Sequence, residues 1–154
     1  MDLTEKIRQL LTENNIDFSE VDHGPAKTCE ESAQERGEDL KIGGKTLLLK
    51  DKTKFHLFVL AASLQADSNK IRKVLKTQRL RFASAQELSY LANVEKGALP
   101  PFGRPILPLD LYVDESITQN KKIAFNAGLL TKSFILKIND YLKIANPIIC
   151  HFSK

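Results

Sequence analysis

The sequence predicts a mixed α/β (α+β) fold, with a mixed, largely antiparallel, barrel-like sheet surrounded by helices. Two apolar runs, Lys45–Lys50 and Phe55–Ala61, are typical of buried strands, and charged residues close the first of them. Segments with helical spacing of apolar residues occur among the strand-like runs without a strict strand–helix alternation. The 154 residues, 42% of them hydrophobic, suffice for one core, so we expect a single domain over 1–154.

The N-terminal third is predicted to hold two helices and one strand. Apolar residues recur at helical spacing over 2–14, and Asp2 can cap that helix. The alternation at 16–19 indicates the start of a strand. Thr28 begins a capping-box pattern, so a short acidic helix is expected to start there and end near Gly37.

The middle of the chain is predicted to form a hairpin, a helix, a short strand and a second helix. The polar residues 51–54 form the turn between the two apolar runs. Asp67 can cap a helix that runs to Leu75, and Arg79–Ala83 has the composition of a short strand. Ser84 begins a second capping box, followed by a helix through Leu91.

The C-terminal part is predicted to hold three strands and a last helix. The strands are expected at Leu109–Val113, Lys122–Phe125 and Ser133–Ile138. Asn126-Ala127-Gly128 is expected to form a turn, and Asn139 to begin a helix that ends at Asn146. The segment Gly97–Gly103 carries two glycines and two prolines, so it cannot be helix or central strand.

Charge is distributed unevenly along the chain. Residues 1–40 carry 4 Lys/Arg against 11 Asp/Glu, whereas residues 41–81 carry 11 Lys/Arg against 2 Asp/Glu. A strongly cationic third is the usual electrostatic signature of a polyanion partner, although an acidic third of the same molecule could instead neutralise it. The basic side chains that we expect to contact such a partner are Lys70, Arg72, Lys73 and Lys76.

The N-terminus has no secretory-signal pattern, and no apolar stretch approaches the ~20 residues of a membrane span. Cys29 and Cys150 do not make a disulfide framework. We therefore expect a cytoplasmic protein without membrane contact.

Several familiar chemistries lack their sequence patterns here. Gly44-Lys45-Thr46 resembles the end of a P-loop, but Asp39 stands where that motif needs glycine, and a strand follows where it needs a helix. There is no Gly-x-Gly-x-x-Gly and no Gly-x-Ser-x-Gly. The three histidines have no metal-ligand spacing, so neither a cofactor nor a metal is expected.

Two features remain as candidates for a site. Lys45 stands at the entrance of a buried strand, where it is either a solvated cation or an anion-binding group. The rigid segment Gly97–Gly103 is either a connector or a wall that holds backbone groups beside a pocket. A fixed backbone and a cation suit the hydrolysis of an activated ester by positioning and charge stabilisation.

The ordered set of motifs resembles the YbaK/ProX family of aminoacyl-tRNA deacylases, related to the editing domain of bacterial prolyl-tRNA synthetases. The resemblance covers roughly Phe18 to Pro147. The segments that carry it are Lys45-Thr46-Leu47-Leu48-Leu49, Phe58–Leu60, the helix from Asp67, Leu80-Arg81-Phe82-Ala83-Ser84 with Glu87, Gly97–Gly103 and Asn126-Ala127-Gly128.

This resemblance implies hydrolysis of mischarged tRNA, of the tRNA(Pro) type and carrying a wrong small amino acid such as Ala or Cys. It implies tRNA as partner, with an aminoacyl-tRNA synthetase as a second possible partner. It further implies catalytic roles for Lys45, Gly97 and Pro101, with Lys45 anchoring the terminal nucleotide and not acting as a base. It assigns substrate binding to Ala98, Leu99, Pro100, Phe102, Gly103, Asn126 and Gly128.

The sequence departs from the family pattern at three places. Glu20-Val21-Asp22-His23 lacks the tyrosine that YbaK-type relatives carry there. Gly128-Leu129-Leu130-Thr131 replaces their Gly-x-Arg-Gly turn, and no histidine lies near Asn126, where alanine-specific relatives have one. The amino acid removed is therefore left open, and Asn126 is either a substrate contact or a turn residue.

Two other functions remain open at this point. The same fold could be a non-catalytic module that binds tRNA or a synthetase. A small-nucleotide hydrolase that uses Lys45 for phosphate is a third reading.

Overall fold

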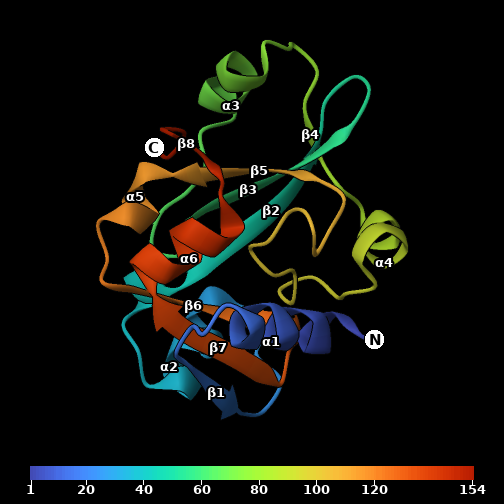
Figure 1. Ribbon diagram of the computed structural model, residues 1–154. Coiled ribbons are helices and arrows are strands. Elements are labelled where there is room, and N and C mark those ends of the chain that lie inside the picture. Colours follow the sequence, from blue (N-terminus) through green and yellow to red (C-terminus); the bar gives the residue numbers. More distant parts are fainter.

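The computed structural model of the protein describes residues 1–154 and has two sheets with helices packed against them (Figure 1). One sheet has the strand order β1-β7-β6 and the other β4-β2-β3-β5-β8. The strands are β1 (Phe18–Asp22), β2 (Gly44–Lys50), β3 (Phe55–Ala61), β4 (Arg81–Phe82), β5 (Asp110–Asp114), β6 (Lys122–Leu129), β7 (Lys132–Lys137) and β8 (Ile148–Cys150). The helices are α1 (Leu3–Glu13), α2 (Cys29–Arg36), η1 (Leu40–Ile42, a 3-10 turn), α3 (Ser68–Leu75), α4 (Ala85–Ala92), α5 (Glu115–Thr118) and α6 (Ile138–Ala145).

The predicted mixed α/β class is confirmed, but the strands form two open sheets and not a closed barrel. The three-stranded sheet is antiparallel throughout. In the five-stranded sheet, β2 pairs antiparallel with β3 and β4, whereas β5 pairs parallel with β3 and β8. A single bridge between Gly43 and Ala124 connects the two sheets beside the start of β2.

The two sheets share one main core. Most of its 26 buried residues come from both sheets, from α1 and α6, and from the segment after Gly97. The sheets come very close at Gly44, because a Cβ built there would lie 2.7 Å from Ile123 Cδ1. A glycine at this position therefore allows the start of β2 to approach β6.

The expected helix caps are formed. Asp2, Thr28 and Asp67 each accept a hydrogen bond from a backbone N–H in the first turn of the helix that follows. Ser84 and Glu87 form the complete reciprocal capping box of α4. Local sequence thus fixes where these four helices begin.

The predicted turn at Asn126-Ala127-Gly128 is wrong. These residues lie inside β6, and the chain turns after them, at Leu130 and Thr131. A break in the β6–β7 register between Asn126 and Leu129 accommodates them, and Gly128 has a φ of +87°. The physical reason is that the Asn126 side chain finds buried partners, which a residue in an exposed turn would not have.

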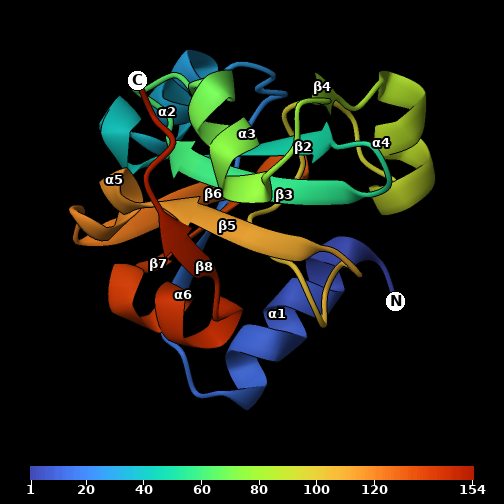
Figure 2. The same cartoon turned by 90° about the horizontal axis from the view of Figure 1, so that it is seen from above.

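Three short elements, η1, α5 and β8, were not expected from the sequence. The exposed β8 residues Ile148 and Ile149 do not alternate in burial, so they give no strand pattern. The view from above shows α2 and α3 along one side of the five-stranded sheet and α1 and α6 on the other side (Figure 2). No helix combines the length and the apolar character that crossing a bilayer requires.

Candidate functional site

A small cavity of about 70 Å³ lies where the start of β2 meets β6, α2 and the loop at Gly97. It opens beside the bridge that joins the two sheets. Of the residues predicted from sequence, it brings together Lys45, Gly97, Leu99 and Asn126. The other lining residues are Lys27, Thr28, Cys29, Ser32, Arg36, Gly43, Gly44, Thr46 and Ala62.

The lining is cationic. Lys27, Arg36 and Lys45 contribute to it, and no Asp or Glu does. The ammonium group of Lys45 donates a hydrogen bond to the Leu64 carbonyl, which fixes the side chain across the end of the β2–β3 hairpin. Burial lowers the pKa of Arg36 to about 10, so this guanidinium is still protonated at neutral pH. The cavity therefore favours an anionic or strongly polarised ligand.

Asn126 forms the centre of the polar network behind the cavity. It is 5% exposed, and its Nδ2 lies 3.1 Å from the Ala26 carbonyl and 2.9 Å from the Gly97 carbonyl. Its Oδ1 accepts hydrogen bonds from Arg36 at 3.3 Å and from Ser133 at 3.0 Å. The side chain thereby holds β6, the loop and α2 in one arrangement.

A serine–histidine pair occurs in the same network but is not arranged as a nucleophile. Ser133 is fully buried, and its hydroxyl donates to Asn126. The same oxygen lies 2.8 Å from Arg36 Nε and 2.8 Å from His23 Nε2. Because Ser133 is fully buried and does not line the cavity, its hydroxyl cannot reach a substrate there.

The loop after Val94 meets the cavity at its first residues only. Gly97 has a φ of +94°, and a Cβ there would lie 2.6 Å from the Lys27 carbonyl oxygen, so only glycine fits. Gly97 and Leu99 line the cavity, and neither amide N–H donates a hydrogen bond within the protein. Two free donors on a fixed backbone are suited to a carbonyl oxygen that gains negative charge.

The remaining predicted residues of this segment do not line the cavity. Pro100 and Gly103 are buried, and Phe102 packs edge-on against Phe125 and Tyr141 in the core. The Pro101 carbonyl accepts a hydrogen bond from the Tyr141 hydroxyl at 2.6 Å. Ala98 is buried too, and its carbonyl accepts from the amide of Gly128, which packs against Leu3 of α1. These residues therefore pack the loop against the core, on the side away from the cavity.

Sequence reasoning missed three lining residues of chemical interest, namely Arg36, Thr46 and Cys29. Thr46 follows Lys45 on β2, and its buried hydroxyl has no hydrogen-bond partner within the protein. Cys29 begins α2, and burial raises the pKa of its thiol, so it is not a thiolate at neutral pH. The one sequence signal for Thr46 is that it is a polar residue inside an otherwise apolar strand.

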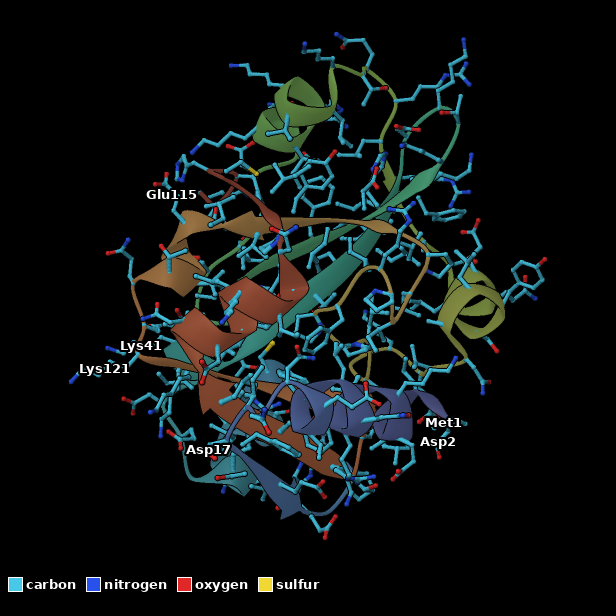
Figure 3. The ribbon with its side chains drawn as sticks, viewed as in Figure 1. Met1, Asp2, Asp17, Lys41, Glu115 and Lys121 are labelled. Carbon is cyan, nitrogen blue, oxygen red and sulfur yellow. The ribbon has the colours of Figure 1, made fainter.

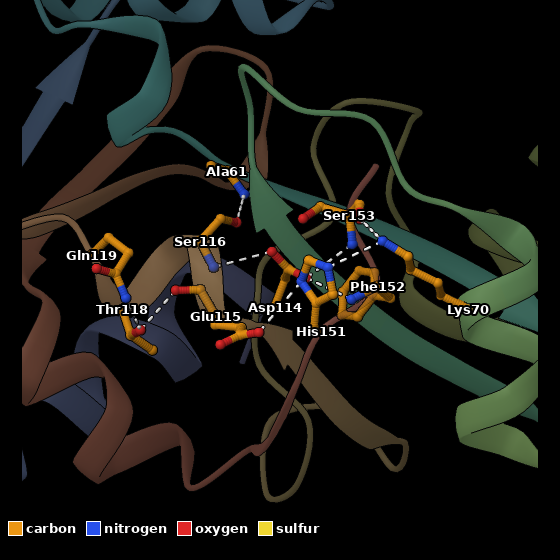
Figure 4. A network of polar contacts seen from close by, with 10 residues as sticks. All are labelled: Ala61, Lys70, Asp114, Glu115, Ser116, Thr118, Gln119, His151, Phe152 and Ser153. Carbon is orange, nitrogen blue, oxygen red and sulfur yellow. Dashed lines mark hydrogen bonds and ion pairs between the residues drawn. The ribbon is translucent and has the colours of Figure 1, made fainter.

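The basic residues predicted to bind a polyanion lie on and just after α3, and their environments differ. Lys70 donates to the Ser153 carbonyl at 2.8 Å and lies beside His151, so it is engaged with the C-terminal segment (Figure 4). Arg72 is engaged with Asn69 and with the Gln78 carbonyl. Lys73 and Lys76 are exposed and form no ion pair.

The residues around the cavity do not provide a metal site, because no group of three His, Cys, Asp or Glu residues is arranged to hold an ion. What the arrangement offers is fixed cations, free backbone donors and a small polar pocket. These groups can bind a polarised ester and stabilise its charge while a water molecule attacks.

Comparisons with known proteins converge on one family. The aminoacyl-tRNA editing domain model matches residues 23–144. The chain is 36% identical over 156 residues to the multifunctional Ser/Thr-tRNA deacylase ProXp-y of Escherichia coli K12, covering 97% of this chain and 92% of that protein. It is 26% identical over 149 residues to the prolyl-tRNA editing protein ProX of Acetoanaerobium sticklandii, covering 94% and 91%.

Two solved structures share the fold. A crystal structure described as a candidate trans-editing enzyme for prolyl-tRNA synthetase has a TM-score of 0.85 and 19% identity, over 100% of this chain and 98% of that chain. A crystal structure of a hypothetical protein has a TM-score of 0.86 and 19% identity, over 97% and 99% of the two chains.

Proposed function

Because this chain belongs to the aminoacyl-tRNA editing domain family, we propose that its cavity is the site at which it hydrolyses the ester of a mischarged tRNA. The protein is an aminoacyl-tRNA deacylase that acts in trans on tRNA charged by a synthetase. This site assignment rests on one observation. Lys45, Arg36, Gly97 and Leu99 line the same small cavity, and the amides of Gly97 and Leu99 donate no hydrogen bond within the protein.

In this proposal the chain supplies position and charge. Lys45 and Arg36 attract the terminal nucleotide and the polarised ester, and the amides of Gly97 and Leu99 receive the carbonyl oxygen as it becomes an oxyanion. Water attacks the carbonyl carbon, the bond to the ribose oxygen breaks, and that oxygen leaves with a proton. No protein base lines the cavity, so the proton passes to solvent or to a group of the substrate.

We further propose that the amino acid removed is small and carries a polar group. The cavity is small, and Thr28, Ser32 and Thr46 give it three hydroxyl groups. The E. coli relative is named for Ser/Thr-tRNA. We therefore rank serine and threonine ahead of alanine and cysteine as the amino acid removed. The tRNA for proline is one of the tRNAs to be tested as the carrier.

The wider assignments follow from the same proposal. The location is cytoplasmic, where charged tRNA is made, and a synthetase is the natural source of the substrate.

Lys73 and Lys76 contribute phosphate contacts from α3. Gln substitutions at these two positions should weaken tRNA binding and make its dependence on salt shallower, by about 0.7–0.9 in the log–log slope for each lost contact.

A panel of tRNAs, each charged with a correct or an incorrect amino acid, tests the activity by loss of the ester. Hydrolysis of Ser- or Thr-charged members, with slower loss of Ala- and Cys-charged members, is expected. Failure to deacylate any member at high protein concentration would leave the non-catalytic binding module as the function.

A Lys45→Met variant then separates the two functions. Loss of one charged contact should lower kcat/KM by about 10- to 100-fold in an enzyme. Lys41 provides the matched control, because it is exposed, lies four residues earlier, and projects outward next to Lys121 (Figure 3). A Lys41→Met variant should keep the wild-type rate.

A further inference from the structure

A second concave surface lies at the far end of β2 from the cavity. We call it the strand-end hollow, and it encloses about 390 Å³. Its lining residues are Lys50, Asp51, Lys52, Gln78, Arg79, Leu80 and Arg81. Four of the seven are cations and one is an anion, so the hollow is electropositive.

The single carboxylate does not neutralise these cations. Asp51 accepts hydrogen bonds from the amides of Thr53 and Lys54 at 2.7 and 2.8 Å, and it lies 2.8 Å from Nε2 of the buried His56. Lys52 and Arg79 are exposed and take part in no ion pair. Two exposed cations without an acidic partner therefore line one hollow, and their positive potential attracts an anion.

An apolar hollow of about 260 Å³ adjoins the strand-end hollow and shares Leu80 and Arg81 with it. Its lining includes Leu49, Ile71 and Phe82 of the sheet and α3. Phe82, on the edge strand β4, is 64% exposed, which is unusual for so large an apolar ring. The Arg81 guanidinium beside it is fixed by Glu87 at 2.7 and 3.0 Å.

The two hollows and the cavity lie along one strand. On β2, Lys45 lines the cavity, and Leu49 lines the apolar hollow four residues later on the same face of the strand, so the separation is about 13 Å. Figure 2 shows α2 and α3 on the same side of the five-stranded sheet, and β4 is the edge strand of that sheet. A polynucleotide whose end enters the cavity can therefore continue along this side to the hollows.

We infer that Phe82 and the strand-end hollow bind the unpaired nucleotides that precede the esterified nucleotide of the tRNA acceptor end. This inference rests on the proposed function. One base stacks on the exposed Phe82 ring, and the adjoining phosphates meet Lys52 and Arg79. Stacking on an aromatic ring beside cations is how proteins bind single-stranded nucleic acid without reading its sequence.

The test compares two substrates that carry the same amino acid: the mischarged tRNA and the aminoacyl ester of adenosine alone. Phe82→Ala should lower kcat/KM on the tRNA by about 5- to 100-fold, the range expected for one lost stacking contact. Lys52→Ala with Arg79→Ala should make the salt dependence of tRNA hydrolysis shallower by about 1.4 in the log–log slope. All variants should hydrolyse the adenosine ester at the wild-type rate.

Matched controls are available on other surfaces. Tyr90 on α4 is 89% exposed and lines neither hollow, so Tyr90→Ala should leave tRNA hydrolysis unchanged. Lys143 is exposed on α6, on the opposite side of the sheet, and Lys143→Ala should do the same.

Wild-type rates on tRNA in the Phe82 and Lys52/Arg79 variants, or an equal loss on both substrates, would overturn this inference. A wild-type protein that hydrolyses neither substrate would instead refute the proposed function.

Discussion

The side-chain amide of Asn126 donates to the Gly97 carbonyl at 2.9 Å, and this contact ties the interior of β6 to the loop that borders the cavity. The amide is directed to the loop because Arg36 and Ser133 occupy its oxygen. A residue of the sheet therefore determines the position of the loop backbone.

Replacing Asn126 by Ala should displace the loop. The change leaves the carbonyl of the buried Ala26 and that of Gly97 without this donor, which costs about 1–3 kcal/mol of unfolding free energy. Deacylation should fall as well, because the Gly97 and Leu99 amides lose their fixed positions. Urea unfolding and ester hydrolysis measure the two effects. Asn139→Ala, at an exposed position, serves as control. Equal stability of the two variants would show that the Asn126 side chain does not hold the loop in place.

Much of the scaffold follows from sequence, because its signals are local. The caps at Thr28 and Ser84 need only residues within one helical turn, and the β2–β3 hairpin needs only two apolar runs and a polar turn. The mixed α/β class is predicted from these alone.

The cavity is only partly predictable, because it forms between segments far apart in the chain. Lys45 and Gly97 were found by their strand and loop contexts. Arg36 was not, because at the end of an acidic helix it has the pattern of a solvated residue, and its partners Asn126 and Ser133 are 90 and 97 residues away. The misplaced turn at Asn126 has the same cause, since an asparagine two residues before a glycine is typical of a turn until its buried partners are known.

Gly97→Ala should disrupt the site more than an ordinary glycine substitution. Its φ of +94° strains any side chain, and the new Cβ would lie 2.6 Å from the Lys27 carbonyl oxygen, which is backbone and cannot swing away. Gly37→Ala separates these causes, because Gly37 also has a positive φ of +70° but has no atom within 4 Å of its Cβ position. We expect a loss of about 1 kcal/mol for Gly37→Ala, from backbone strain alone. Gly97→Ala should lose more, together with most of the deacylase activity.

Thr46→Val should change selectivity without harming the fold. The Thr46 hydroxyl is buried without a partner, so its removal relieves a desolvation cost and should leave the melting temperature equal or higher. If the hydroxyl meets a polar group of the substrate, kcat/KM for Ser-charged tRNA should fall by about 2- to 10-fold. The rate on Ala-charged tRNA should not change. An equal change on both substrates would remove Thr46 from substrate recognition.

The acid stability of the protein should depend on Asp114, which fastens the C-terminal segment to the end of β5 (Figure 4). Burial alone would raise the pKa of this carboxyl, but hydrogen bonds from Ser116, Phe152 and Ser153 outweigh burial and lower the pKa below its usual value. An acid with a lowered pKa in the folded state binds its proton more readily when unfolded. Its contribution is therefore complete above a pH of about 4 and is lost as the pH falls through the lowered value.

Asp114→Asn should reduce the unfolding free energy at neutral pH by about 1–3 kcal/mol, because an amide cannot accept all three hydrogen bonds. The variant should also lose part of the acid dependence, so its stability should approach that of the wild type at low pH. Melting temperatures measured between about pH 3 and pH 7 test both expectations. Asp17→Asn is the control, because Asp17 is exposed and its side chain forms no hydrogen bond or ion pair within the protein. A constant difference between Asp114→Asn and wild type across that range would show that the carboxylate charge does not fasten the C-terminal segment.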